Sequence, residues 1–157
     1  MIISTKQTRR VSGRGGRRPG AGRPRGRTTV EHGRRERFVP DQPQLVTLRV
    51  AEDVRSLRAA RAMRVIQQSI QAGQRDAFRV VEVGVEPRRL QLLVHARGAR
   101  ELSLGMTGLK VRLARQLNRV LDRSGSLFAE RYRSQTLRTP AEVRAARRQV
   151  RGEASPS

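Results

Sequence analysis

The sequence has no cysteine and few aromatic residues, with no tryptophan, one tyrosine and three phenylalanines among 157 residues. Without cysteine it has no disulfide framework, no thiolate metal site and no cysteine nucleophile. So few rings also disfavour base recognition by stacking on exposed aromatic side chains. No uncharged run approaches the ~20 apolar residues of a membrane span, and the first residues, MIISTKQTRR, lack the apolar core of a signal peptide. We therefore expect a cytoplasmic protein of bacterial type with no membrane partner.

Positive charge is what the sequence has in excess, with 35 Lys and Arg residues against 13 Asp and Glu and a net charge of +22. Only Lys6 and Lys110 are lysines, and arginine is the better bidentate ligand of phosphate. A codon bias toward arginine replaces lysine but does not create a surplus of this size. We therefore expect a polyanionic partner, and the charge alone fits DNA, RNA and the ribosome equally.

Residues 1–43 differ in composition from the rest of the chain. They hold 12 of the 35 basic residues, 7 of the 14 glycines and 4 of the 7 prolines. Such a segment buries too little apolar surface to offset its ordering entropy, so we predict a disordered basic arm. Its centre, GRGGRRPGAGRPRGR, favours a phosphate-binding tail over a minor-groove hook at residues 22–27. The predicted DNA-contacting residues of this arm are Arg14, Arg17, Arg18, Arg23, Arg25 and Arg27.

From residue 44 onward the pattern is that of a folded domain, which we expect over residues 44–151, followed by a frayed tail at 152–157. The periodicities predict the order β-α-β-β-α-β-α, an α+β fold with an antiparallel sheet of four to five strands and helices packed on it. The predicted strands cover residues 45–50, 78–85, 90–95 and 127–137. The predicted helices run from a cap at Asp53 to Gly73, from Ala99 to the turn at 124–126, and from Ala141 toward Arg151.

The long segment after Ala99 has the clearest helical pattern. Apolar residues recur in it every three or four positions, at Leu102, Met106, Leu109, Leu113, Leu117 and Val120. Basic residues occupy its other side, and Arg112, Arg115 and Arg119 share one face. We predict that these three arginines and Lys110 contact nucleic acid.

Short motifs occur along the folded part in a fixed order. They are Val46–Arg49, Phe78–Val81, Leu92–Val94, Gly105–Leu109, Arg112–Arg115, Leu117–Arg119, Leu127–Tyr132 and Leu137–Pro140. In this order and at these spacings they resemble the HUH-type single-tyrosine transposases, in particular the REP-associated tyrosine transposases of bacterial genomes. The arm sequence GGRRPGAGRPR is similar to arms of some members. The resemblance spans about residues 13–150.

This resemblance implies chemistry on single-stranded or hairpin DNA, in DNA transposition and recombination by a mobile element. In the family, two histidines separated by one hydrophobic residue lie on a central strand and bind a divalent metal ion that polarises the scissile phosphate. Residues two apart on a strand point to the same side, so both reach one ion. A tyrosine on the C-terminal helix attacks the phosphate and forms a covalent 5′-phosphotyrosine bond to single-stranded DNA.

The chain departs from the family at these positions. It has Arg89-Leu90-Gln91 where the histidine pair is expected and about Gln149 where the tyrosine is expected, and its only histidines are His32 and His95. A guanidinium group stays protonated and ligates no metal, and a single amide oxygen holds metal weakly. We therefore expect no catalytic residue at these positions, no bound metal and no other cofactor. We predict that Arg89 contacts a DNA phosphate instead.

Tyr132 is the only tyrosine in the chain. It is either a displaced nucleophile or a strand residue on the side of Phe128, whose ring packs and whose hydroxyl faces water. With no histidine pair expected opposite it, the packing role is favoured.

The sequence thus favours a DNA-binding protein of the transposase family that has lost its catalytic residues and is associated with the bacterial nucleoid. Two alternatives remain open. One is an active transposase that cuts single-stranded DNA through an unusual site, and the other is a basic RNA- or ribosome-binding module whose likeness to the family is architectural. A homodimer is compatible with the sequence, which carries no signal for or against it.

Overall fold

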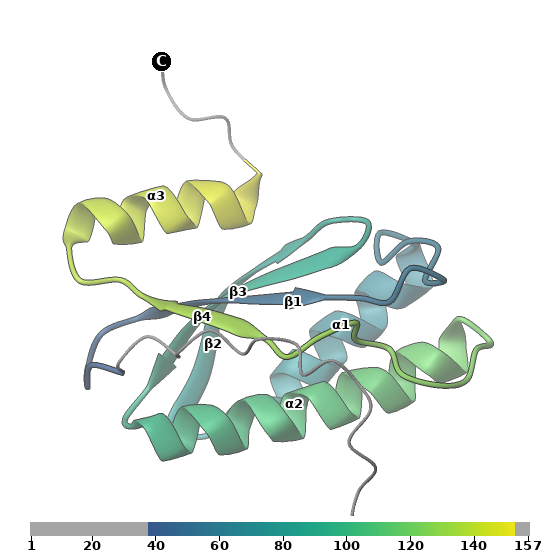
Figure 1. Ribbon diagram of the computed structural model, residues 1–157, viewed down its shortest axis with the longest axis horizontal. Helices are drawn as coiled ribbons and strands as arrows, with labels where there is room; N and C mark the ends of the chain where they lie inside the picture. The colour runs from purple at the N-terminus through teal and green to yellow at the C-terminus, as the bar shows by residue number, and fades with distance from the viewer. Residues whose placement is uncertain (1–37, 153–157) are drawn as a thin grey trace, which may run out of the picture. The chain divides into compact units, whose positions relative to one another are not determined.

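The computed structural model describes residues 38–152, and its elements follow the predicted order (Figure 1). The strands are β1 (Gln44–Arg49), β2 (Phe78–Val85), β3 (Arg89–Ala96) and β4 (Arg133–Thr136), and the helices are α1 (Ala60–Gly73), α2 (Ala99–Val120) and α3 (Pro140–Arg151). The expected α+β fold with the order β-α-β-β-α-β-α is confirmed. No helix within residues 38–152 is long and apolar enough to cross a membrane.

The four strands form one antiparallel sheet in the order β2-β3-β1-β4. β1 pairs with β3 so that Leu48 lies opposite Leu90 and Val46 opposite Leu92. Directly opposed residues project to the same side of a sheet, and successive residues alternate between its sides. The register therefore assigns every strand residue to one of two faces.

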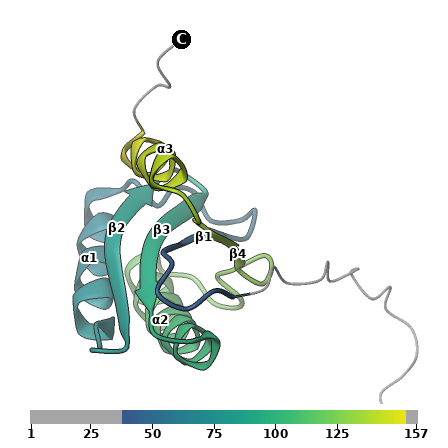
Figure 2. The ribbon, with the colours of Figure 1, turned by 90° about the vertical axis from the view of Figure 1, so that its left-hand side faces the viewer.

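One face of the sheet is covered by α1 and α2 (Figures 1 and 2). Its strand residues are aliphatic and fully enclosed, and Leu48, Leu90 and Leu92 are each 0% exposed. The apolar stripe predicted for α2 points into this core through Leu102, Met106, Leu109, Leu113 and Leu117. At about 25 cal/mol per Å² of apolar surface removed from water, this large cluster is the main source of stability.

The opposite face of the sheet carries α3 (Figure 2). The contact is a small apolar cluster in which Ala146 and Val150 of the helix pack with Leu45, Leu93 and Leu137. This cluster has far fewer buried residues than the core on the other face. α3 is therefore attached through a narrow apolar contact.

The C-terminal end of α3 is held by ion pairs and by a close backbone contact. Glu82 of β2 pairs with Arg147 at 3.0 Å and with Arg151 at 3.2 Å. Gly84 lies so close to α3 that an added Cβ would stand 2.2 Å from the carbonyl oxygen of Val150. Only glycine allows helix and strand to approach this closely at that point.

The limits of α3 follow from its capping residues. At its start the Thr139 side chain accepts a hydrogen bond from the Glu142 N–H, and the Glu142 carboxylate accepts one from the Thr139 N–H. Pro140 occupies the first turn, where no backbone N–H is needed. Gly152 ends the helix in the left-handed region with a φ of 73°. The helix expected from Ala141 to Arg151 is thus confirmed.

The fourth strand is shorter than predicted. We expected a strand over residues 127–137, whereas β4 covers only Arg133–Thr136. In β4 Arg133 pairs with Thr47, and continuing that register would bring residue 130 to Val50, but Val50 is bridged to Phe128 instead. Two extra residues lie between these pairings, and they interrupt the strand. Tyr132 consequently precedes β4 and is not a strand residue.

The first helix begins later than predicted, at Ala60, and Asp53 does not cap it. The Asp53 carboxylate instead accepts a hydrogen bond from Arg123 at 2.6 Å, which lowers the pKa of Asp53 below its usual value. The Leu57 N–H donates to the carbonyl of Pro87 at 2.9 Å, so it is not available to a helix. Bonds to distant segments therefore hold residues 53–59 in an irregular path.

Candidate nucleic-acid interface

Beyond the C-terminal end of α3, the sheet continues toward the β2–β3 turn (Figure 1). The residues of its α3 side are polar and basic there. Thr47 of β1 lies between its two strand partners, Gln91 of β3 and Arg133 of β4. Two residues further along β1, closer to the β2–β3 turn, Arg49 lies opposite Arg89. All five alternate with the aliphatic residues of the large core and so point to the face that carries α3. We call them the open sheet face, after the exposed Arg49 and Arg133 and the half-buried Arg89, whereas Gln91 is buried close to the end of α3.

Positive charge is concentrated on this open sheet face. Arg49 and Arg89 are directly opposed, and like charges in this position repel each other. Glu86 offsets part of the repulsion by accepting hydrogen bonds from Arg89 Nε at 3.0 Å and Nη2 at 2.8 Å. Arg133 is 3.4 Å from Glu130, whereas Arg49 is exposed and forms no ion pair within residues 38–152. The arrangement attracts an anion.

Gln91 lies between these arginines and is only 2% exposed. Within residues 38–152, the buried polar side-chain atoms without a hydrogen-bond partner belong to Ser69, Arg123 and Arg148, and Gln91 is not among them. A ligand on this face would therefore meet the guanidinium groups around Gln91 first.

These residues do not fit the divalent metal ion that the family resemblance implies. Arg89 is a permanent cation already bound to Glu86, and Gln91 offers one neutral oxygen where a hard cation needs several charged or carbonyl oxygens. Across residues 38–152, no three His, Asp or Glu side chains come together in a way that could hold a metal ion. The open sheet face is therefore suited to anions and not to cations.

The structure brings the position expected for the nucleophile to the same side of the sheet as Gln91. Gln149 lies on α3 next to Val150, which contacts Gly84, the β2 partner of Gln91. The Gln149 side chain is exposed, however, and carries no nucleophilic hydroxyl.

Tyr132 lies on the other side of the sheet. Its ring is partly buried against the large core that α1 and α2 cover, as is the ring of Phe128. The sheet thus separates the only phenol of the chain from Arg89 and Gln91.

The predicted basic residues of α2 divide into two groups. Arg112, Arg115 and Arg119 follow one side of the helix at steps of three and four, and we call them the α2 arginine face. Arg115 and Arg119 are exposed and Arg112 is half-buried. These three side chains form a continuous basic stripe.

Lys110 does not belong to this stripe. It projects from another side of α2, where its Nζ lies 5.0 Å from the centre of the Phe128 ring. Burial, and to a lesser degree the positive charge of Arg131, lowers the pKa of Lys110. The lysine thus helps to attach the segment before β4 to the helix.

Two basic residues of the open sheet face, Arg49 and Arg133, are absent from the sequence-based prediction. The alternation of residues along a strand predicts that both point away from the apolar face of the sheet. What the sequence does not reveal is how far α3 extends over that face. The predicted contacts of the arm at Arg14, Arg17, Arg18, Arg23, Arg25 and Arg27 lie outside the described residues.

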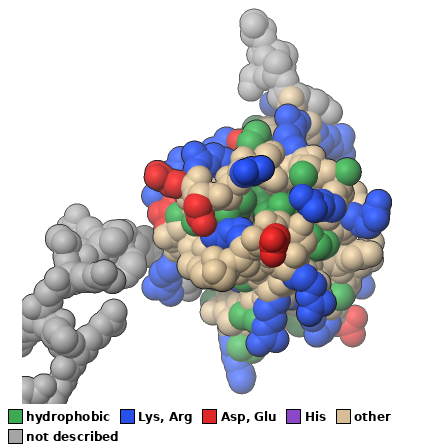
Figure 3. All heavy atoms as spheres, turned by 90° about the vertical axis from the view of Figure 1, so that its right-hand side faces the viewer, with side chains coloured by type: hydrophobic (Ala, Val, Ile, Leu, Met, Phe, Trp, Pro, Cys, Tyr) green, Lys and Arg blue, Asp and Glu red, His purple; other side chains and the backbone are tan. Residues whose placement is uncertain are grey.

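Basic side chains are also spread widely over the surface. Seen from the right-hand side of Figure 1, Lys and Arg occur in all parts of the view and acidic side chains are fewer (Figure 3). This distribution supports long-range attraction of a polyanion.

Comparison with known proteins identifies structural relatives. No protein-family model matches the sequence, and no curated protein matches it. A REP-associated tyrosine transposase bound to a REP hairpin is similar in structure, with a TM-score of 0.57 and 13% sequence identity over 71% of this chain and 66% of that one. A presumed transposase from Deinococcus radiodurans R1 is similar with a TM-score of 0.50 and 14% identity, over 78% of this chain and 99% of that one.

These likenesses establish the fold. The chain has a transposase-like α+β fold, as the resemblance of its motifs implies. It spans just under two thirds of the length of the transposase that was solved with a REP hairpin.

Proposed function

We propose that this chain binds single-stranded or hairpin DNA and does not cut it, in a setting of DNA transposition on the bacterial chromosome. The observation that carries the proposal is the pair Arg89 and Gln91, which lie on a central strand where the resembled family has its metal-binding histidines. Arg49 and Arg133 add positive charge on the same face. Such a site holds a phosphate and leaves its ester bonds intact.

Three features support DNA as the partner. The net charge of +22 favours a polyanion, and nearly all of the basic residues are arginines, which bind phosphate oxygens in pairs. The α2 arginine face supplies a second basic surface on the other side of the sheet from Arg89. The fold, moreover, is similar to that of a transposase bound to a REP hairpin.

The absence of cutting follows from the chemistry of the residues in place. Transesterification by the family's route needs a nucleophilic hydroxyl and a metal ion that stabilises charge on the phosphate. Gln149 supplies no nucleophile, and Arg89 with Gln91 does not bind a divalent cation. Each of these losses alone costs on the order of 100-fold or more in rate.

A covalent-adduct assay tests the proposal. The purified full chain is incubated with a labelled DNA hairpin that carries a single-stranded extension, in Mg²⁺ or Mn²⁺. We expect a retarded complex on a native gel and no protein–DNA band that survives SDS. The Tyr132→Phe variant should give the same two results, because Tyr132 contributes packing and not chemistry.

Two results would contradict the proposal. An SDS-stable band that disappears in Tyr132→Phe would identify an active transposase with its nucleophile before β4. Tighter binding of ribosomal RNA than of hairpin DNA at the same salt concentration would instead identify an RNA- or ribosome-binding module.

A further inference from the structure

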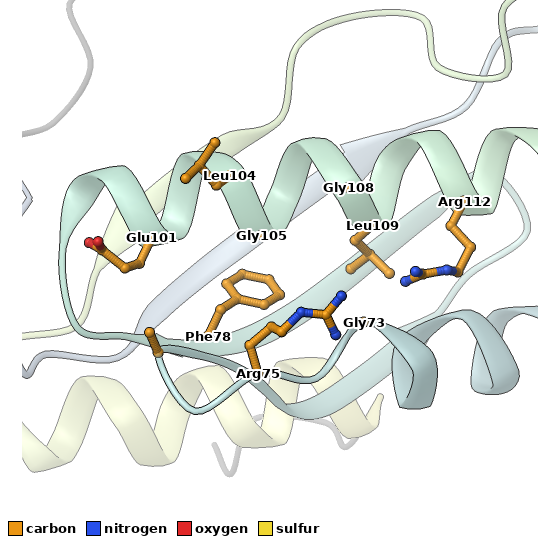
Figure 4. A pocket seen from close by; sticks show the side chains of 10 residues that line it. Gly73, Arg75, Phe78, Glu101, Leu104, Gly105, Gly108, Leu109 and Arg112 are labelled. Atoms are coloured by element: carbon orange, nitrogen blue, oxygen red, sulfur yellow. The ribbon is translucent and has the colours of Figure 1, made fainter.

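A groove lies between the N-terminal half of α2 and the segment that joins α1 to β2, away from the open sheet face (Figure 4). Its volume is about 260 Å³. Its lining is mostly apolar and includes Leu104, Leu109, Gly105 and Gly108 of α2 and the edge of Phe78. Leu104 is 62% exposed, which makes it one of the few large hydrophobic side chains at the surface of the described part.

Gly105 and Gly108 of α2 both line this groove, but only Gly105 is required by packing within the protein. A Cβ on Gly105 would lie 2.3 Å from the Phe78 ring, so packing within the protein requires a glycine. A Cβ on Gly108 would meet nothing within 4 Å. Glycine within a helix destabilises it relative to alanine, and at Gly108 no protein contact explains that loss. What Gly108 provides is open space above the groove.

Two cations converge at one end of the groove. Figure 4 shows the guanidinium groups of Arg75 and Arg112 close to Gly73, with Glu101 at the other end. The Arg75 guanidinium donates to the carbonyl oxygens of Ala72 and Gln74, at 3.4 and 2.9 Å. Neither arginine forms an ion pair within residues 38–152, so both are available to an anion.

We propose that the groove binds one unpaired nucleotide of a single-stranded DNA segment; this inference rests on the proposed function. The phosphate lies between Arg75 and Arg112, and the base lies over Gly105 and Gly108 against Leu104. Glu101 at the far end repels a second anionic group and so fixes this orientation. The base is held by apolar contact, because Phe78 is 2% exposed and offers no free ring face.

The size of the groove supports a single nucleotide. A volume of 260 Å³ equals about nine waters at ~30 Å³ each, which suits one base and is too small for a longer segment. The groove is also continuous with the α2 arginine face, because Arg112 belongs to both. A strand that follows these arginines would deliver a nucleotide to the groove.

The test fills the groove and leaves its charges in place. A leucine at position 108 leans over the preceding helical turn and covers Gly105. The matched control is Thr107→Leu, which introduces the same side chain at the preceding position of α2. Thr107 is exposed and does not line the groove. Three DNAs are compared by fluorescence anisotropy at one salt concentration: a hairpin with a single-stranded extension, the same hairpin with an abasic extension, and a blunt hairpin.

We expect the wild-type chain to bind the normally extended hairpin most tightly. Gly108→Leu should weaken that binding about tenfold, equivalent to ~1.4 kcal/mol, and leave the abasic and blunt hairpins unaffected. Arg112→Gln should weaken both extended hairpins, because it removes the phosphate contact. Thermal unfolding followed by circular dichroism shows that each variant is folded.

The outcomes separate this inference from the proposed function. If the wild-type chain bound no hairpin, both would be overturned. If it bound hairpins but Gly108→Leu behaved like Thr107→Leu on every DNA, the nucleotide site would be overturned and DNA binding would stand. Equal weakening of the blunt hairpin by Gly108→Leu would also overturn the site.

Discussion

The two faces of the sheet are built by the same strands and differ in packing and in charge. On β3, Leu90 and Leu92 point into the core that α1 and α2 cover and are fully enclosed. Arg89 and Gln91 alternate with them and point to the open sheet face. The first face is covered by two helices, and the second carries the single helix α3 (Figure 2).

This difference separates stability from binding within one domain. The large core already removes enough apolar surface from water to hold the fold, so residues of the second face are not all needed for packing. Where α3 ends, polar residues on that face cost little and are able to serve a ligand. A strand whose residues alternate between the two faces thus contributes to the stability of the core and to the binding surface at the same time.

The largest expected effect concerns two neighbouring leucines of β3. Leu92→Ala should lower the free energy of unfolding by about 4 kcal/mol, because the cavity is enclosed by the sheet and two helices. Leu93→Ala should cost about 2 kcal/mol, because α3 rests on a small cluster and is able to settle into the gap. Urea denaturation measures both values. Equal losses would mean that the two faces are packed equally well.

The next effect concerns DNA binding by the two basic surfaces. Arg49→Glu on the open sheet face and Arg115→Glu on the α2 arginine face should each weaken binding of hairpin DNA about tenfold more than Arg61→Glu on α1. All three substitutions change the net charge equally, and Arg61 is exposed on a helix that has no proposed contact. A titration at fixed salt is the measurement. Equal weakening by all three would mean that only the total charge matters.

The smallest effect concerns the attachment of α3. Glu82→Gln removes the negative charge that pairs with Arg147 and Arg151 and should cost about 0.5–1 kcal/mol. Hydrogen exchange should become faster in α3 than in the strands, since the narrow apolar contact then holds the helix alone. Glu52→Gln, at an exposed position, serves as the control. Uniformly faster exchange in all elements would contradict a local role for Glu82.

Much of the fold could be predicted from the sequence because its signals are periodic and local. The five residues of the α2 stripe from Leu102 to Leu117 are all buried, as their spacing indicates. The hairpin of β2 and β3 follows from two β-rich segments around a turn at Glu86–Arg88. Thr139, Pro140 and Glu142 likewise mark the start of α3 by capping chemistry that needs no distant partner.

The predictions that failed depend on distant partners. Asp53 has the composition of a helix cap, but its carboxylate is bound by Arg123, 70 residues away in the sequence. The segment 127–132 has residues that suit a strand, but its pairing with β1 changes register between Phe128 and Arg133. Local propensity does not encode either choice, since each is made by competition with a tertiary contact.

The candidate site divides in the same way. The sequence by itself determined the excess of arginine, the loss of the histidine pair at Arg89 and Gln91, and the stripe of Arg112, Arg115 and Arg119, because each is a matter of residue type and spacing. Only the tertiary structure decided that Arg49 and Arg133 join Arg89, because strand register sets Arg49 opposite Arg89 and brings Arg133 into the neighbouring row with Thr47 and Gln91. Only the tertiary structure decided, too, that α3 stops short of them, because the ion pairs of Glu82 and the contact at Gly84 determine where the helix lies.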